Sequence, residues 1–185
     1  MTSEPLSPSQ AVLLLADHQA GVLEYVVKAP PREQVEANVL RLARAAAALG
    51  MPVIFTTSDE VGNGTLLPAL EQIAPEAYTG RIERHGIIDA LADPAVAAAL
   101  TATSRRQLIT AGIGTDVCGV APALHGSRDG YQVTFAADAA GSLTPLAHDI
   151  SLRRMEHDGI TVATTATVIA ELAGDYATYS KIMRG

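Results

Sequence analysis

The sequence predicts a three-layer α/β sandwich, in which helices cover both faces of a doubly wound, mainly parallel, six-stranded sheet. Two observations predict this Rossmann-like architecture. Short apolar or β-rich runs alternate along the chain with segments of helical periodicity, and the first of these runs, residues 11–16, is apolar throughout. A continuous apolar run is typical of a parallel strand that is buried on both faces. Because strand, helix, strand crossovers are right-handed, a chain that alternates in this way places helices on both faces of its sheet.

The first half of the chain supplies two strands and two helices in this pattern. The apolar residues of 35–50 recur at helical spacing and end at a glycine, which predicts a helix and its stop. Residues 52–57 are the next predicted strand, and the Gly-Asn-Gly turn that follows leads into a short apolar stretch at 66–73, where we expect a helix. Residues 81–90 are charged and lack clear periodicity, so we expect a surface loop there.

The alternation continues through the second half of the chain, where helical patterns and β-rich runs follow one another. The predicted helices are 94–100, 117–124, 145–155 and 166–172, and the predicted strands are 106–112, 131–136 and 161–163. The sequence has no internal repeat or low-complexity tract. A length of 185 residues suits one compact core, so we expect a single domain over residues 1–185.

Composition restricts the kinds of partner that the protein can have. The chain has 13 basic and 20 acidic residues, for a net charge of −7, whereas non-specific binding to nucleic acid depends on clusters of Lys and Arg. No apolar run approaches the roughly 20 residues that span a bilayer, and the first residues lack a basic region followed by an apolar one. We therefore expect a cytoplasmic protein that binds neither nucleic acid nor membrane.

Asp17 is the first candidate for a functional side chain. It directly follows the strand at 11–16, and doubly wound sheets bind their ligands outside the carboxyl ends of the strands. The alternative is that Asp17 only caps a turn or a helix, which is a common role of aspartate. The adjacent His18 points the opposite way on an extended segment, so we interpret His18 as structural.

Cys118 is the only cysteine of the chain, so it is either a small buried apolar residue or a reactive thiol. The loop at 113–117 places Cys118 in the first turn of the next helix, where backbone N–H groups and the helix dipole stabilise a thiolate. A cation such as Arg84 would lower the pKa of the thiol further and complete a constellation of acid, cation and nucleophile. Only proximity in the fold decides between the two interpretations.

Three segments of the sequence resemble the isochorismatase-like cysteine hydrolases. They are Leu14-Leu-Ala-Asp-His-Gln19, the stretch 81–90 and Ala111-Gly-Ile-Gly-Thr-Asp-Val-Cys118, and their order and approximate spacing agree with that family. Further matches run over nearly the whole chain: Gly130-Tyr-Gln-Val133, Asp138-Ala-Ala-Gly-Ser142, His148, Arg154-Met155 and Glu171-Leu172. The resemblance implies the isochorismatase-like hydrolase fold and a homo-oligomer.

The resemblance also implies a catalytic triad of Asp17, Arg84 and Cys118. Much of the superfamily has lysine where this chain has Arg84, and the arginine is similar to that of a branch of small hydrolases without assigned substrates. A guanidinium stays protonated and offers a planar fork, so it can hold a thiolate or clamp a substrate carboxylate, but it cannot move protons. Asp17 must therefore transfer the protons.

Further expectations concern the surroundings of the nucleophile, and they too follow from the resemblance. The backbone N–H groups of Gly114 and Cys118 would form an oxyanion hole, and the Ile113–Gly114 peptide bond would be cis. His85 and Asp89 are the expected substrate-binding residues, although related chains often carry asparagine in place of Asp89. The nicotinamidase branch binds zinc through an aspartate and nearby histidines, but no Asp-x-His pair follows the second predicted strand here, so we expect neither a metal nor a cofactor.

The implied activity is hydrolysis of a C–N bond of a small molecule through a thioester on Cys118. The alternative is a catalytically impaired member that acts as a small-molecule binding or scaffold protein, and the departures at Arg84 and Asp89 motivate it. A third class, a flavodoxin-like nucleotide-binding domain, fits the strand pattern, but residues 17–21 contain one glycine and cannot form a glycine-rich phosphate loop. A reactive thiol would favour the enzyme, and an inert thiol the binding protein.

Overall fold

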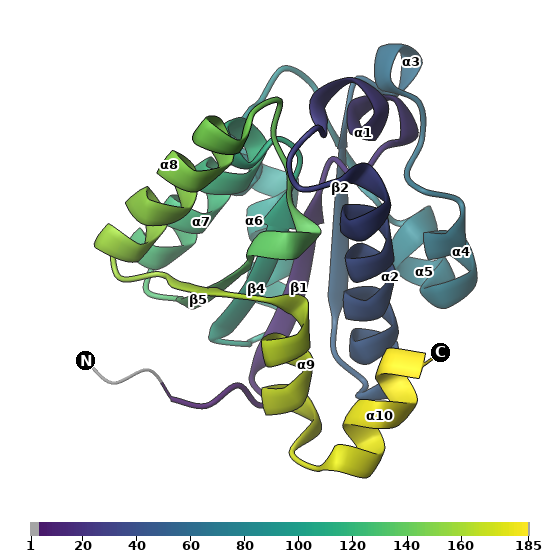
Figure 1. Cartoon of the computed structure of the whole chain (residues 1–185), viewed down its shortest axis with the longest axis vertical. Helices are drawn as coiled ribbons and strands as arrows, with labels where there is room; N and C mark the ends of the chain where they lie inside the picture. The colour runs from purple at the N-terminus through teal and green to yellow at the C-terminus, as the bar shows by residue number, and fades with distance from the viewer. Residues whose placement is uncertain (1–3, 185) are drawn as a thin grey trace.

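The central sheet has the predicted architecture. The computed structural model describes residues 4–184, which form a six-stranded sheet in the order β3-β2-β1-β4-β5-β6 with every neighbouring pair parallel (Figure 1). The strands are β1 (Ala11–Ala16), β2 (Val53–Ser58), β3 (Ile82–Arg84), β4 (Gln107–Gly112), β5 (Gln132–Ala136) and β6 (Thr161–Ala163). β1 and β4 are buried along their whole length because both faces of the sheet are covered.

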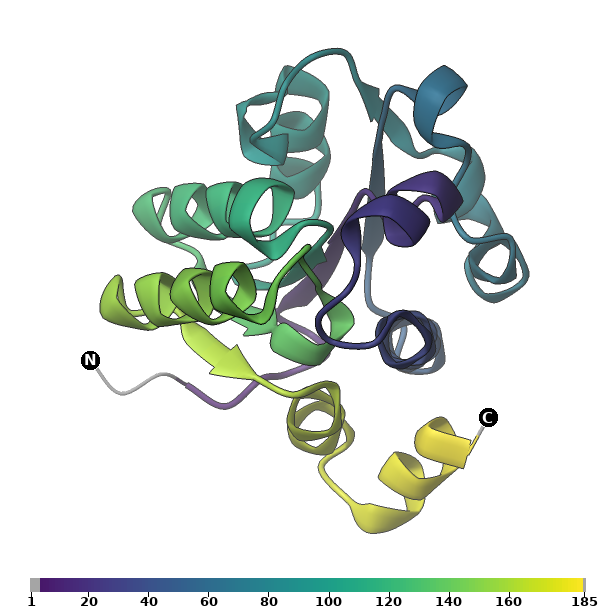
Figure 2. The ribbon, with the colours of Figure 1, turned by 45° about the horizontal axis from the view of Figure 1, so that its top comes forward.

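Two layers of helices cover the sheet and complete the predicted doubly wound sandwich (Figures 1 and 2). One layer contains α2 (Arg32–Ala48), α4 (Ala69–Ile73), α5 (Pro75–Thr79), α9 (Thr165–Ala173) and α10 (Tyr176–Arg184). The other contains α6 (Pro94–Ala102), α7 (Val120–Arg128) and α8 (Pro145–His157). The short helices α1 (Ala20–Val26) and α3 (Glu60–Asn63) follow the carboxyl ends of β1 and β2. Within residues 4–184, no helix has the length and apolar character that a bilayer span needs.

The structure corrects two of the predicted elements. Residues 82–84, expected in a surface loop, form the edge strand β3, whose three residues pair with the end of β2 and are too few to show a period in the sequence. The helix expected at 66–73 begins later, as α4, and a second short helix, α5, follows it outside the predicted range. Pro75 begins the second of them, because proline fits the first turn of a helix and interrupts an existing one.

The strand order reverses between β1 and β4, which lie side by side at the centre of the sheet. This switch point brings together the segments that follow the two strands, and those segments carry Asp17 and Cys118. Gly112 at the end of β4 makes the close approach possible. A Cβ atom there would lie 2.7 Å from the Cys118 carbonyl oxygen, so a larger residue would push the Cys118 turn off the strand.

Candidate active site

Asp17 lies at the carboxyl end of β1 in a left-handed backbone conformation, with φ of 61°. Its N–H donates to the Thr56 carbonyl of β2 (3.0 Å), so the backbone stays tied to the sheet while the turn begins. The left-handed conformation costs most residues on the order of 1 kcal/mol, and aspartate tolerates it better than they do. The carboxylate is buried and caps neither a turn nor a helix, since its partner is a guanidinium.

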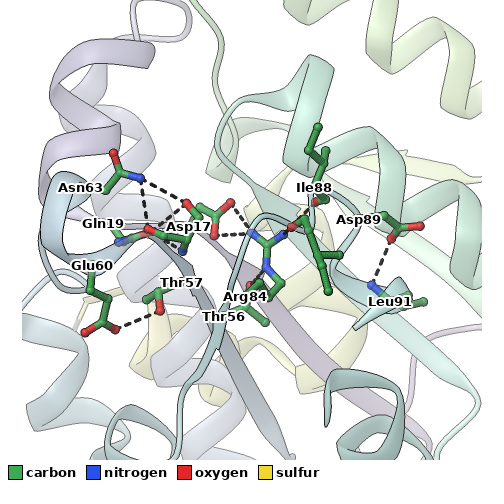
Figure 3. Close-up of polar contacts among 12 residues, drawn as sticks. Asp17, Gln19, Thr56, Thr57, Glu60, Asn63, Arg84, Ile88, Asp89 and Leu91 are labelled. Atoms are coloured by element: carbon green, nitrogen blue, oxygen red, sulfur yellow. Dashed lines mark hydrogen bonds and ion pairs between the residues drawn. The ribbon is translucent and has the colours of Figure 1, made fainter. Parts of the chain in front are cut away.

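Arg84 is also buried, and protein acceptors bind all five of its N–H donors (Figure 3). Nε donates to the Thr56 hydroxyl (3.2 Å), and Nη1 donates to the carbonyls of Ile87 and Ile88 (2.8 Å for Ile88). Nη2 donates to both Asp17 oxygens at 2.5 Å. Because a guanidinium has five donors, none remains for a substrate, and the expectation that Arg84 could clamp a substrate carboxylate is wrong.

Arg84 stays charged despite its burial. Desolvation disfavours the charged guanidinium, but the hydrogen bonds and the negative charge of Asp17 outweigh desolvation, so the pKa of Arg84 lies above its ordinary value. Removing one member of such a pair leaves the other charge buried without compensation. The arrangement therefore fixes the position of the Asp17 carboxylate at the edge of the sheet.

Cys118 lies in the π-helical turn η2 (Thr115–Gly119), which runs directly into α7. Single π-helical turns are frequent at functional sites because they redirect a side chain from its helical position. The turn is held by two hydrogen bonds of 3.0 Å from the N–H groups of Val117 and Gly119 to the Gly114 carbonyl. The peptide bond between Ile113 and Gly114 is cis. Cys118 is partly exposed as a residue.

The charge state of Cys118 differs from the one expected. Burial, followed by the negative charge of Asp17 and a hydrogen bond to it, raises the pKa of the thiol to about 12, and the opposing effect of Arg84 is smaller. The cation therefore does not hold Cys118 as a thiolate, because its charge is already offset by Asp17. In the resting site Cys118 is therefore a thiol beside the Asp17 carboxylate.

Asp17 and Cys118 line one pocket of about 330 Å³ at the switch point of the sheet. Its apolar lining residues are Val22, Tyr25, Val26, Ile113, Val117 and Leu143, and its other lining residues are Asp17, Ser58, Asn63, Gly114, Asp116 and Cys118. The α1 wall of this pocket is not predicted from the sequence, since a helix of seven residues is too short to show a clear period. A larger groove of about 530 Å³ between α2 and α5 contains no nucleophile.

Two predicted substrate-binding residues do not line this pocket. His85 lies in the bend directly after β3, with 83% of its side chain exposed. Asp89 caps the 3₁₀ turn η1 (Ala90–Ala92) by accepting from the Leu91 N–H at 3.0 Å, and it pairs with His125 on α7 at 2.7 Å. Both assignments are corrected: Asp89 joins β3 to α7, and His85 faces solvent.

His18 has the structural position expected from its alternation with Asp17. It is fully buried, and its Nε2 lies 2.9 Å from the Ala139 carbonyl oxygen. Burial lowers the pKa of His18 to about 4, so the ring is neutral near neutral pH. Among residues 4–184, no group of three or more His, Cys, Asp or Glu side chains is arranged to hold a metal ion.

Known proteins match both the sequence and this geometry. A family model described as the isochorismatase domain matches residues 11–167. The probable hydrolase YcaC of Escherichia coli K12 is 36% identical over 172 residues, which cover 92% of this chain and 81% of YcaC. The isochorismatase domain-containing protein 2 of Xenopus laevis is 30% identical over 171 residues, which cover 92% of this chain and 79% of that protein.

Two solved structures of YcaC resemble the whole fold. YcaC from Pseudomonas aeruginosa, solved with hexane-2,5-diol and covalent acrylamide, has a TM-score of 0.91 at 35% identity, covering 98% of this chain and 91% of that one. The Escherichia coli protein, described as an octameric hydrolase of unknown specificity, has a TM-score of 0.91 at 34% identity, covering 98% and 90%. The family model, the sequence identity and the fold together show that this chain belongs to the isochorismatase family of hydrolases.

Proposed function

We propose that the protein is a cysteine hydrolase that cleaves a C–N, amide-like bond of a small molecule through a thioester on Cys118. The observation that carries the proposal is the shared pocket, in which the Cys118 thiol meets the buried carboxylate of Asp17. A nucleophile beside a base, with the base oriented by a third group, is the arrangement that covalent catalysis requires. Here the third group is Arg84.

In the first half of the reaction the Cys118 sulfur attacks the substrate carbonyl carbon while the thiol proton passes to Asp17. The negative charge that develops on the carbonyl oxygen is stabilised by the backbone N–H groups of Gly114 and Cys118. Asp17 then donates its proton to the substrate nitrogen, the C–N bond breaks and the amine departs. The products of this half are the free amine and an acyl group joined to Cys118 as a thioester.

In the second half water hydrolyses the thioester. Asp17 accepts a proton from the water molecule as its oxygen attacks the acyl carbon. The C–S bond breaks, the departing sulfur takes the proton back from Asp17, and the carboxylic acid leaves the pocket. One carboxylate thus serves both halves, alternating between acceptor and donor.

Arg84 acts as a positioning residue, since all its donors bind protein atoms. It holds the Asp17 carboxylate in place beside Cys118, and it remains protonated throughout because a guanidinium does not release its proton in this pH range. Preorganised charges of this kind need not rearrange during the reaction.

The covalent acrylamide on YcaC from Pseudomonas aeruginosa supports the proposal, since acrylamide adds to nucleophilic groups and that protein is 35% identical to this one. One observation favours the second function, a small-molecule binding protein with impaired catalysis. The pKa of Cys118 is raised to about 12, which makes the thiol a poor nucleophile unless Asp17 takes its proton.

Acrylamide labelling followed by intact mass spectrometry separates these two functions. Cys118 is the only cysteine, so a single adduct that is absent from Cys118→Ser reports this thiol alone. For a hydrolase we expect labelling faster than that of the chain unfolded in urea, and release of amine from at least one member of a panel of small amides. Labelling slower than in the unfolded chain, with no member hydrolysed, would establish the binding protein instead.

We also propose that the protein forms a homo-oligomer, because Escherichia coli YcaC is octameric. Leu143, just before α8, and Leu146 and Ile150, on α8, support the proposal, since they are 60%, 64% and 52% exposed. Neighbouring exposed apolar side chains mark surfaces that other chains cover. Light scattering after size-exclusion chromatography should give the mass of several chains, and the mass of one chain would refute the proposal.

A further inference from the structure

The residues that line the active-site pocket have an unbalanced set of charges. Two carboxylates, Asp17 and Asp116, line the pocket, whereas no Lys, Arg or His among residues 4–184 does. Arg84 balances the negative charge of Asp17, and its own N–H groups are bound to protein acceptors. The charge of Asp17 is therefore matched within the protein, and the charge that the pocket presents to a ligand depends on Asp116.

Asp116 has no cationic partner in the described part of the chain. Its Oδ1 accepts a hydrogen bond of 2.6 Å from the Ser142 hydroxyl, and no salt bridge involves it. Lys28 belongs to the nearby segment that pairs with Ser142 through the backbone, but its ammonium donates to the Glu24 carbonyl at 2.8 Å. A hydroxyl donor leaves the negative charge of Asp116 in place.

The carboxylate of Asp116 also lies close to the reacting groups. Asp116 is two residues before Cys118 in the same turn and is exposed. A Cβ atom built on Gly114 would lie 3.0 Å from Asp116 Oδ1, so this oxygen contacts the loop that carries the proposed oxyanion hole. A ligand whose carbonyl reaches that loop has its neighbouring substituents within a few ångströms of a negative charge.

From these observations we infer that Asp116 determines substrate charge: the pocket accepts neutral or cationic substrates and rejects those with an anionic group near the scissile bond. The inference rests on the proposed function, because it concerns the same nucleophile and the same pocket. The apolar wall formed by Val22, Tyr25 and Val26 receives the body of the substrate, and Asp116 accepts hydrogen bonds from an amine, ammonium or amide group beside the bond. Small carboxylates lack the cation that their binding requires.

Three alkylating reagents of similar size but different charge test the inference on Cys118 without knowledge of the substrate. They are iodoacetate, iodoacetamide and 2-bromoethylamine, with each rate divided by the rate of the same reagent with 2-mercaptoethanol. We expect iodoacetate to be disfavoured relative to iodoacetamide. In Asp116→Asn the iodoacetate rate should rise roughly three- to tenfold, as expected for removal of one unit charge at close range, while the iodoacetamide rate changes by less than about twofold.

Two further variants separate a local effect from the general negative charge of the protein. Glu156→Gln removes one exposed carboxylate from the far end of α8 and should leave the ratio of the three rates unchanged. Asp116→Glu keeps the charge and should keep the penalty on iodoacetate.

The possible failures of the two proposals differ from one another. Rapid labelling that ignores reagent charge, or equal changes in Asp116→Asn and Glu156→Gln, would overturn the role of Asp116 and leave the hydrolase proposal standing. If no reagent labels the folded chain faster than the chain in urea, the proposed function is wrong, and the inference about Asp116 with it.

Discussion

The inner and outer halves of the active site differ in how firmly their side chains are held. In the inner half, Asp17, Arg84 and Thr56 are buried and every donor of the guanidinium has an acceptor. In the outer half, Tyr25 is 75% exposed and Asp116 is exposed with a hydroxyl as its partner. The inner half resembles a packed core, whereas the outer half can change residues at little cost in stability. Substitutions in the two halves should have different consequences.

The largest effect is expected from Asp17→Asn, which removes the proton acceptor but keeps the shape of the side chain. We expect hydrolysis of an amide that the native protein cleaves to fall by about 10³-fold. Alkylation of Cys118 by iodoacetamide should fall as well, because the variant has no carboxylate to accept the thiol proton. The two rates are measured on the same preparation. Alkylation at the native rate in Asp17→Asn would mean that Asp17 does not activate the thiol.

Arg84→Met should have the largest effect on stability. It leaves Asp17 buried without its cation, and we expect a loss of about 3–5 kcal/mol in the free energy of unfolding, measured by urea denaturation. The matched control is Arg81→Met, which breaks a more exposed pair with Glu60 and should cost less than about 1 kcal/mol. In the double variant Asp17→Asn with Arg84→Met the loss should be smaller than the sum of the single losses. Additive losses would show that the two side chains are not coupled.

The buried imidazole of His18 predicts a pH dependence of intermediate size. Its pKa is lowered from 6.5 to about 4 in the folded protein, so the unfolded chain binds a proton that the folded chain does not. The contribution of His18 to the free energy of unfolding is fully present above about pH 6.5 and is lost as the pH falls toward 4. The loss amounts to about 2 kcal/mol by pH 5. His18→Gln should flatten this decline in urea denaturation, whereas His157→Gln, on the surface of α8, should not. An unchanged decline in His18→Gln would assign it to other groups.

Tyr25→Ala, in the outer half, should have the smallest effect on stability and a selective effect on binding. The free energy of unfolding should change by less than about 0.5 kcal/mol, since the side chain is 75% exposed. KM should rise severalfold with kcat nearly unchanged, because the ring lines the pocket but lies apart from the reacting groups. Tyr176→Ala, at 76% exposure on α10, is the control and should change neither constant. A large loss of stability in Tyr25→Ala would remove the distinction between the two halves.

The sequence predicts the fold, and it indicates Asp17 and Cys118 as candidates, because those signals are local. The apolar run of β1 and the cysteine in the turn after β4 can both be recognised within a few residues. β3 was missed, since its three residues pair with β2 only in the folded sheet. The resemblance assigns His85 and Asp89 to substrate binding, but His85 is exposed to solvent and Asp89 pairs with His125.

The pKa of the Cys118 thiol can be derived only from the three-dimensional structure. Arg84 alone predicts a lowered pKa for the Cys118 thiol, and this prediction was wrong because the guanidinium is bound to Asp17. The pKa of the thiol combines the effects of burial, one carboxylate and one cation, and these effects depend on distances between segments that are far apart in the chain. The outer half was equally hidden, because α1 is short and Asp116 has no distinctive spacing apart from its position beside Cys118.

The two carbonyls that accept from Arg84 Nη1 link the identity of the cation to the path of the chain after β3. Ile87 and Ile88 present these carbonyls only because the backbone turns back over the guanidinium. A lysine at position 84 has one nitrogen with three donors, which cannot reach Asp17, Thr56 and both carbonyls together. Replacing this arginine by lysine therefore leaves the two carbonyls without a donor, so the segment at 85–88 must be redesigned as well. For protein engineering, the transferable unit is the side chain together with the four residues that follow it.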